Sequence, residues 1–314
     1  MRKFEPIQLN DVRTISLRDR KHKVKIEEFA RPSRPGASFQ DFLRSLPDIL
    51  VGREFREFVR RVADAVRCGR TVVVGLGGHV VKTGMGPVLS ELMARGAITA
   101  LAMNGAAAIH DVEVAMVGGT SEDVAHGLED GSFGMAEETA DFLNSAAREA
   151  SEGFGGALGR KIDEEDLPFR EYSLLWNAYR KGITTTVHVA IGTDVVHQHP
   201  SCDGGAVGRA TYTDFRIFCS VVANLDGGVY INLGSAVVLP EVFLKALTVA
   251  RNLGYDVRNF TTANFDMLQH YRPRVNILDR PTRTGGKGYA FVGHHEIMVP
   301  LLAYSLLEEL EDAT

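Results

Sequence analysis

The chain has 314 residues, of which 45% are hydrophobic, and its formal net charge is −5. A chain of this kind can bury one large or two modest cores, and its negative charge excludes a general attraction to nucleic acid or an anionic membrane. Three widely spaced cysteines without a CxxC pair predict reduced thiols in a cytoplasmic protein. No apolar run near the N-terminus is typical of a secretion signal, and none approaches the length of a membrane span.

The first 37 residues are rich in Lys and Arg and include the run ARPSRPG. This composition predicts an N-terminal arm over residues 1–37, followed by one domain over residues 38–314. Apolar residues at helical spacing between Ser38 and Gly69 predict a helical lead-in, with Ser38 as its cap.

Strand-like and helix-like segments then alternate. Apolar, β-branched runs predict strands over residues 71–76, 97–105, 183–192, 227–236, 257–266 and 289–293. Apolar periodicity predicts helices over residues 80–96, 112–118, 135–162, 166–182, 211–225, 240–255 and 296–311. Residues 272–288 are expected to form a long irregular connection. The alternation predicts an α/β fold with a parallel, Rossmann-like sheet and flanking helices.

Several predicted strands end in turns of small residues. These turns are GLGGH at 75–79, MNGAA at 103–107, IGTD at 191–194 and NLGS at 232–235. Because the carboxyl ends of parallel strands share one edge, the turns should converge on one ligand site, where glycines let a backbone approach a phosphate. The first turn matches neither GxGxxG nor a P-loop, so tight strand–helix packing is the alternative explanation for each turn.

The order of these segments resembles that of the deoxyhypusine synthase family, whose members have a parallel-sheet NAD-binding domain. The resemblance depends on the runs GLGGHVVKTG, MNGAAAIHD, IGTD, NLGSAVV, NFTT and GGKG, which occur in the family's order. It implies NAD as the cofactor. The residues that it implies as cofactor contacts are Gly77, Gly78, His79, Val80, Val81, Lys82, Met103, Asn104, Gly105, Asp111, Asp194, Gly234, Ser235, Thr261, His294 and His295.

The GGKG run places Lys287 on the family's catalytic lysine. The resemblance implies a transferase in which an amine is oxidised to an imine with NAD and the lysine takes over the alkyl group. Such a lysine must be neutral when it attacks, so its pKa must fall from ~10.4. A solvated loop lysine is the alternative interpretation.

The polyamine half of the family pattern is divergent. Gly285 stands where the family has a tryptophan, and His199 and His294 stand where it has acidic residues. We therefore expect a substrate other than or beyond spermidine, such as an amine or amino acid whose carboxylate Arg283 could bind. His110, His199 and Arg283 are the expected substrate contacts. A protein acceptor stays open, and the resemblance implies a homotetramer.

Two further hypotheses belong to other classes. His188, His197, His199 and Cys202 lie close together in the sequence, and an HxH pair can hold zinc, so a zinc-dependent hydrolase is one alternative. No HExxH motif completes such a site, and hydrogen-bonded histidines without a metal explain the cluster equally simply. The other alternative is a catalytically inactive NAD-binding protein.

Overall fold

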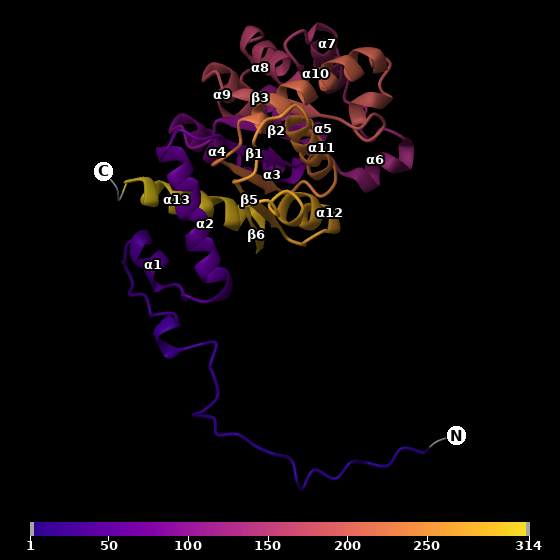
Figure 1. Cartoon of the computed structure of the whole chain (residues 1–314). Helices are drawn as coiled ribbons and strands as arrows, with labels where there is room; N and C mark the ends of the chain where they lie inside the picture. Colours follow the sequence, from indigo (N-terminus) through magenta and orange to yellow (C-terminus); the bar gives the residue numbers. More distant parts are fainter. Residues whose placement is uncertain (1–2, 312–314) are drawn as a thin grey trace. The chain divides into compact units, whose positions relative to one another are not determined.

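The computed structural model describes residues 3–311 and divides into two compact units, one extending to Arg53 and one beginning at Glu54 (Figure 1). The unit that contains the arm therefore extends beyond residue 37, and the boundary expected there stays a prediction. No helix among residues 3–311 has both the length and the apolarity of a membrane span.

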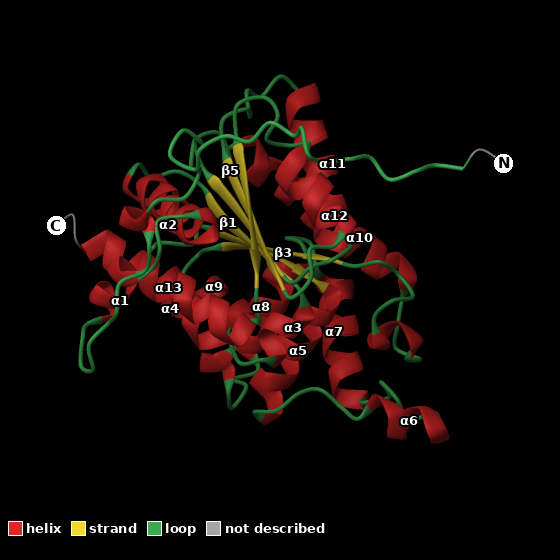
Figure 2. Ribbon diagram, turned by 90° about the horizontal axis from the view of Figure 1, so that it is seen from below, coloured by secondary structure: helices red, strands yellow, loops and turns green. Residues whose placement is uncertain are grey.

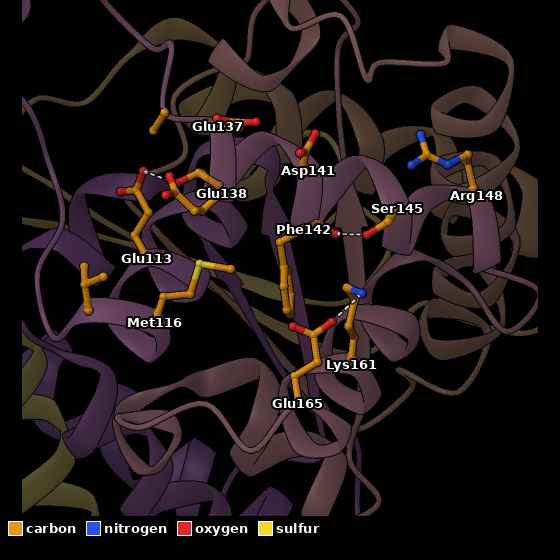
Figure 3. Close-up of a pocket in the computed structure, with 13 residues that line it drawn as sticks. Glu113, Met116, Glu137, Glu138, Asp141, Phe142, Ser145, Arg148, Lys161 and Glu165 are labelled. Carbon is orange, nitrogen blue, oxygen red and sulfur yellow. Dashed lines mark hydrogen bonds and ion pairs between the residues drawn. The ribbon is translucent and has the colours of Figure 1, made fainter.

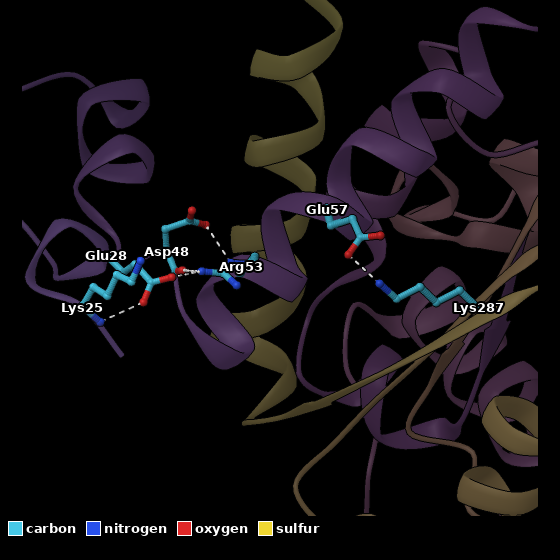
Figure 4. Close-up of polar contacts among 6 residues, drawn as sticks. All are labelled: Lys25, Glu28, Asp48, Arg53, Glu57 and Lys287. Atoms are coloured by element: carbon cyan, nitrogen blue, oxygen red, sulfur yellow. Dashed lines mark hydrogen bonds and ion pairs between the residues drawn. The ribbon is translucent and has the colours of Figure 1, made fainter. Parts of the chain in front are cut away.

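The first unit contains an extended arm, the short 3-10 helix η1 (Ile26–Glu28) and helix α1 (Phe39–Ser45). Ser38 caps α1, because its hydroxyl accepts the backbone N–H of Asp41 at 3.1 Å. Arg53 donates to the Glu28 carboxylate at 2.6 Å and to the Asp48 carboxylate at 3.4 Å (Figure 4). These local contacts are the polar framework of this unit.

Six parallel strands form the sheet of the second unit. They are β1 (Val72–Leu76), β2 (Ala100–Asn104), β3 (Thr184–His188), β4 (Val229–Leu233), β5 (Thr261–Asp266) and β6 (Lys287–Val292). Their order is β3-β2-β1-β4-β5-β6, which is the Rossmann order. The predicted α/β fold with a parallel sheet is thus confirmed. The chain reverses its direction of strand addition between β1 and β4, and ligands of such sheets bind outside the carboxyl ends at this switch point.

Helices cover both faces of the sheet (Figure 2). The helices and short helical turns are α2 (Leu50–Arg67), α3 (Gly78–Lys82), α4 (Gly86–Ala94), α5 (Gly105–Val117), α6 (Val124–Asp130), α7 (Glu137–Glu149), α8 (Phe154–Glu164), η2 (Arg170–Tyr172), α9 (Leu174–Arg180), η3 (Val195–Gln198), α10 (Gly204–Ala223), α11 (Val238–Asn252), α12 (Tyr271–Pro273), η4 (Arg274–Asp279) and α13 (His295–Glu311). On one face, Phe218 of α10 and Phe243 of α11 pack with Val73 and Tyr230. On the other, Leu89 of α4 and the α13 side chains meet Val72 and Val74 of β1.

Several predicted elements differ from the structure. The helix expected over residues 80–96 breaks at Gly84, and the one over residues 135–162 breaks near Gly153, because both glycines adopt positive φ values of 80° and 99°. The connection over residues 272–288 is not irregular throughout, since η4 is a π-helix packed on β5 and β6. Helix α5 begins at Gly105, earlier than expected, because the Asn104 side chain accepts the Ala107 N–H at 2.9 Å and caps it.

Candidate functional site

The turns that follow β1 and β4 touch at the switch point of the sheet. The Gly77 N–H donates to the Leu233 carbonyl at 2.9 Å. A Cβ atom on Gly77 would collide with the carbonyl oxygen of Gly234, so no larger residue fits without moving the backbone. Gly234 itself has a φ of 66°, a left-handed conformation that favours glycine. The GLGGH turn therefore lies where Rossmann sheets bind their ligands.

A second close approach lies beside the first, where α5 begins. A Cβ on Gly105 would collide with the Asp194 carboxylate, which comes from the turn after β3. A Cβ on Gly78 would lie 3.0 Å from the Ala106 Cβ and 3.1 Å from Cδ2 of His110. Turns after β1, β2 and β3 are thus packed together at the carboxyl edge by residues without side chains.

Three buried polar atoms near this edge have no hydrogen-bond partner within residues 3–311: Oδ2 of Asp194, Oδ1 of Asn232 and Nδ1 of His295. The amide nitrogen of Asn232 is satisfied, because it donates to the Ser235 carbonyl at 2.9 Å and to Asn264 Oδ1 at 2.7 Å. Buried polar atoms are rarely left unpaired in folded proteins. A bound ligand or water at the carboxyl edge would supply the missing partners.

Burial sets the protonation of the titratable groups at this edge. It raises the pKa of Asp194 to about 6. It also lowers the pKa of His295, and the nearby Asp266 carboxylate opposes this shift without reversing it. The His295 ring lies 5.8 Å from that of His79, measured between centroids. The edge therefore presents a neutral imidazole and a carboxyl that protonates easily.

Most residues implied as cofactor contacts follow the carboxyl ends of the strands. Those in the turns or at the helix starts are Gly77, Gly78, His79, Asn104, Gly105, Asp194, Gly234, Ser235, His294 and His295. Val80 and Val81 are buried in α3, Lys82 ends that helix, and Met103 is buried within β2. The predicted convergence of the small-residue turns is seen in the structure.

Lys287 and Thr261 lie elsewhere. They are the first residues of β6 and β5 and pair with each other in register, which places them at the amino edge of the sheet. The Lys287 ammonium donates to Glu57 at 2.6 Å (Figure 4) and lies 4.9 Å from the Tyr289 ring centroid. The Glu57 hydrogen bond raises the pKa of Lys287, whereas a nucleophilic amine needs a lowered one. The structure thus gives Lys287 an ion-pairing role, away from the carboxyl edge.

Two other expected contacts already have partners. The Asp111 carboxylate is buried and accepts the Ser173 hydroxyl and the backbone N–H groups of Leu174 and Leu175, so it caps α9. The guanidinium of Arg283, in the turn before β6, pairs with Asp279 at 2.8 Å. Both groups therefore already have partners within the protein.

The histidine cluster does not form a metal site. His188 is buried, contacts the Thr186 hydroxyl at 2.9 Å and has a pKa that burial lowers to about 3. His197 accepts the Gly192 N–H at 3.2 Å, and His199 pairs with the Ser201 hydroxyl at 2.8 Å. Within residues 3–311, no three His, Cys, Asp or Glu side chains are grouped to hold a metal ion. The zinc hydrolase hypothesis is therefore wrong.

A groove of about 970 Å³ lies between α5, α7 and α8 (Figure 3). Its acidic lining consists of Glu113, Glu137, Glu138, Asp141 and Glu165, and its basic lining of Arg148 and Lys161. Met116 and Phe142 supply apolar walls, and the Lys161 ammonium lies 5.1 Å from the Phe142 ring centroid. Carboxylates outnumber cations in this lining, so the groove complements a positively charged molecule better than an anion.

A series of hydrogen bonds that could not be predicted from the sequence connects this groove to the GLGGH turn after β1 (residues 75–79, the glycine turn). His110 Nδ1 lies 2.7 Å from the Thr120 hydroxyl, which makes a short hydrogen bond to Glu113. Thr139 also donates to Glu113, at 3.3 Å. Burial would raise the pKa of Glu113, but the His110 imidazole and both hydroxyls outweigh it and lower that pKa. The His110–Glu113 spacing on one helix was a detectable signal, whereas the return of Thr120 after Gly118 was not.

No protein-family model matches the chain, and a search of curated proteins finds no match. Among solved structures, AgrE in a ternary complex with ornithine and NAD⁺ is similar, with a TM-score of 0.52, 16% identity, and coverage of 83% of this chain and 33% of AgrE. A LOR/SDH-type protein from Methanococcus maripaludis S2 has a TM-score of 0.52 and 16% identity, covering 83% and 70% of the two chains.

A protein classed as a deoxyhypusine synthase, from Entamoeba histolytica, has a TM-score of 0.51 and 10% identity, covering 87% and 94%. At these identities the likeness shows a shared Rossmann-like fold alone. The chain spans about a third of the length of AgrE.

Proposed function

We propose that the chain is an NAD-dependent enzyme that oxidises an amine or amino acid. The observation that carries this proposal is the contact between the β1 and β4 turns at the switch point, where a side chain on Gly77 would strike the Gly234 carbonyl. A turn without side chains at this place lets a dinucleotide approach the backbone.

The residues of the carboxyl edge fit such a cofactor. Most Rossmann sheets carry an acidic residue after the second strand to bind a ribose hydroxyl, but here β2 ends at Asn104, whose side chain caps α5. Asp194 brings a carboxylate to Gly105 from the β3 turn, and its Oδ2 has no partner among the described residues. Asp194 would accept the ribose hydroxyl, and the Gly77–Gly78 backbone would face the phosphates. NAD would supply a hydride acceptor.

An amine substrate is supported by two observations. AgrE, one of the similar structures, was solved with ornithine and NAD⁺. In this chain, the acidic groove beside α5 complements an ammonium group. The alkyl transfer through Lys287 is left out of the proposal, because that ammonium is ion-paired at the amino edge. The homotetramer and a protein acceptor remain proposals that follow from the deoxyhypusine synthase resemblance, and a cytoplasmic location remains a proposal that follows from the unpaired cysteines.

Calorimetric titration with NADH tests the proposed function. The wild type should bind NADH, and His79→Ala, which removes a ring beside the glycine turn, should weaken binding by about tenfold, or 1.4 kcal/mol. The matched control is His126→Ala, an exposed histidine of α6. Absence of heat with NADH and NADPH, combined with an intact thermal transition, would reject NAD-dependent chemistry and favour another function for this edge.

A further inference from the structure

His110 occupies the first half of α5, between the glycine turn and the acidic groove. On one side, its Cδ2 atom is 3.1 Å from the position that a Gly78 Cβ would take. On the other side, Thr120 links it to Glu113, which lines the groove. The His110 side chain is 20% exposed, so it is enclosed but still reachable. His110 therefore lies between the expected cofactor site at the glycine turn and the acidic groove.

Hydrogen bonding determines which nitrogen of His110 carries the proton. A carboxylate only accepts hydrogen bonds, so Thr120 must donate its single hydroxyl proton to Glu113. The Thr120 oxygen can then only accept from His110, which requires a proton on Nδ1. Nε2, the nitrogen bonded to Cδ2, is left with its lone pair free. The ring is oriented as a base whose free nitrogen lies on the side away from Thr120.

A carboxylate also lies on the Thr120 side of the ring. The Glu113 carboxylate lies 3.8 Å from His110 Nδ1 and is held by hydroxyl donors from Thr120 and Thr139. A histidine that takes up a proton on Nε2 would therefore face a fixed negative charge through Thr120. A base oriented by a hydroxyl and a partly buried carboxylate is an arrangement suited to general-base catalysis.

The loop after α5 makes this chain of contacts possible. Gly118 ends α5 in a left-handed conformation with a φ of 69°, and its N–H donates to the Val114 carbonyl at 2.9 Å. This reversal returns the chain along the helix, so that Thr120 meets His110 and Glu113. Thr120 is held there by two hydrogen bonds, because it donates to one residue and accepts from the other.

We propose that His110 is the general base of the reaction and that Thr120 and Glu113 position it. This inference rests on the proposed function. In the step, Nε2 of His110 takes one proton from the substrate's ammonium group, breaking an N–H bond and forming another on the imidazole. NAD⁺, when bound, would supply the hydride acceptor for the carbon that carries the resulting neutral amine. The proton stays on His110, next to Glu113, until it passes to solvent or product.

Nitrogen NMR of histidine-labelled protein tests the geometry without cofactor or substrate. His110 signals are identified by their loss in His110→Gln. The wild type should show His110 protonated on Nδ1, and Thr120→Val, which keeps the shape but removes the hydroxyl, should release this preference. A wild-type ring protonated on Nε2 would overturn the inference, whatever the protein does with NAD.

Turnover supplies the second arm, with NAD⁺ and L-ornithine as the probes. His110→Gln should lower the rate by about 10²–10⁴-fold while NADH affinity and the thermal transition stay at wild-type values. His126→Gln, on an exposed histidine, should leave the rate unchanged. Thr120→Val should lower the rate less than His110→Gln does. Unchanged turnover in His110→Gln would overturn the inference but leave the proposed function intact, whereas a wild type that cannot bind NADH would remove the proposed function. If ornithine is not oxidised, the NMR arm alone decides.

Discussion

Asp111 offers the sharpest test of how burial and hydrogen bonding act together in this fold. Its carboxylate accepts Leu174 N–H at 2.7 Å, Leu175 N–H at 3.0 Å and the Ser173 hydroxyl, and the side chain is 1% exposed. In Asp111→Asn, the amide oxygen can serve Ser173 and Leu175, but the amide N–H group then faces the Leu174 N–H. One unpaired buried donor should cost about 1–3 kcal/mol of unfolding free energy.

This cost should depend on pH, because burial raises the pKa of Asp111 to about 6. The unfolded carboxyl ionises near its ordinary pKa of ~3.9, so the folded state holds its proton longer. Stability from this group is therefore fully present below about pH 4 and is lost as pH rises through about 6. When pH rises from 4.5 to 7.5, this group should lower the unfolding free energy of the wild type by about 2 kcal/mol, a loss that Asp111→Asn does not share.

Urea unfolding at pH 4.5 and 7.5 measures both effects. The difference in unfolding free energy between the wild type and Asp111→Asn should change by about 2 kcal/mol between the two pH values, with the wild type favoured more at the lower pH. Asp11→Asn, at an exposed position of the arm, is the matched control and should follow the wild type at both. NADH affinity should be unchanged, because Asp111 caps α9. A parallel pH dependence in wild type and Asp111→Asn would refute the assignment of a buried, protonation-sensitive cap.

Three further predictions concern the two edges of the sheet. Lys287→Ala should leave NADH affinity and amine turnover unchanged and alter unfolding free energy by about 0–1 kcal/mol, since its ion pair with Glu57 is partly exposed; a loss of turnover in steady-state assays would restore its catalytic role. Gly105→Ala should destabilise the fold by about 1–3 kcal/mol, because the added methyl group clashes with Asp194. In a double-mutant cycle, Asp194→Ala should relieve that cost without restoring NADH affinity. Additive costs of the two substitutions would contradict the contact. His188 has a pKa lowered to about 3, so its share of stability is present above about pH 6.5 and lost as pH falls, by up to about 1.4 kcal/mol per pH unit. In urea titrations, His188→Gln should lose less unfolding free energy than the wild type as pH falls below about 6.5. An equal loss in both proteins would show that other groups cause the decrease.

The strands and their parallel arrangement could be predicted from the sequence because the strands are short, β-branched runs that helices separate. The local errors came mainly from glycine. Gly84 and Gly153 lie within good helical patterns, and only their positive φ values break the helices. Helix α5 starts with Gly-Ala-Ala-Ala, which has no apolar period, yet these small residues are what allow the close packing against Gly78.

The glycine turns could be located from the sequence, because carboxyl ends of parallel strands must share an edge. Lys287 could not be placed correctly in this way. The match to the GGKG motif predicts only where Lys287 comes in the sequence of motifs, not at which end of a strand it lies. As the first residue of β6, it lies at the amino edge, away from the matched turns. Thr120 was missed for a related reason, since its contact with His110 depends on a loop reversal that no spacing rule reveals.

Hydrogen–deuterium exchange with and without NADH tests the central claim most directly, because it locates binding as well as detecting it. Bound NADH should slow exchange for residues 77–82, 104–107 and 234–235, which lie at or just after the carboxyl ends of β1, β2 and β4. Exchange around Thr261 and Lys287, at the starts of β5 and β6, should not change. Protection confined to the starts of β5 and β6, or no protection anywhere at saturating NADH, would contradict a cofactor site at the switch point.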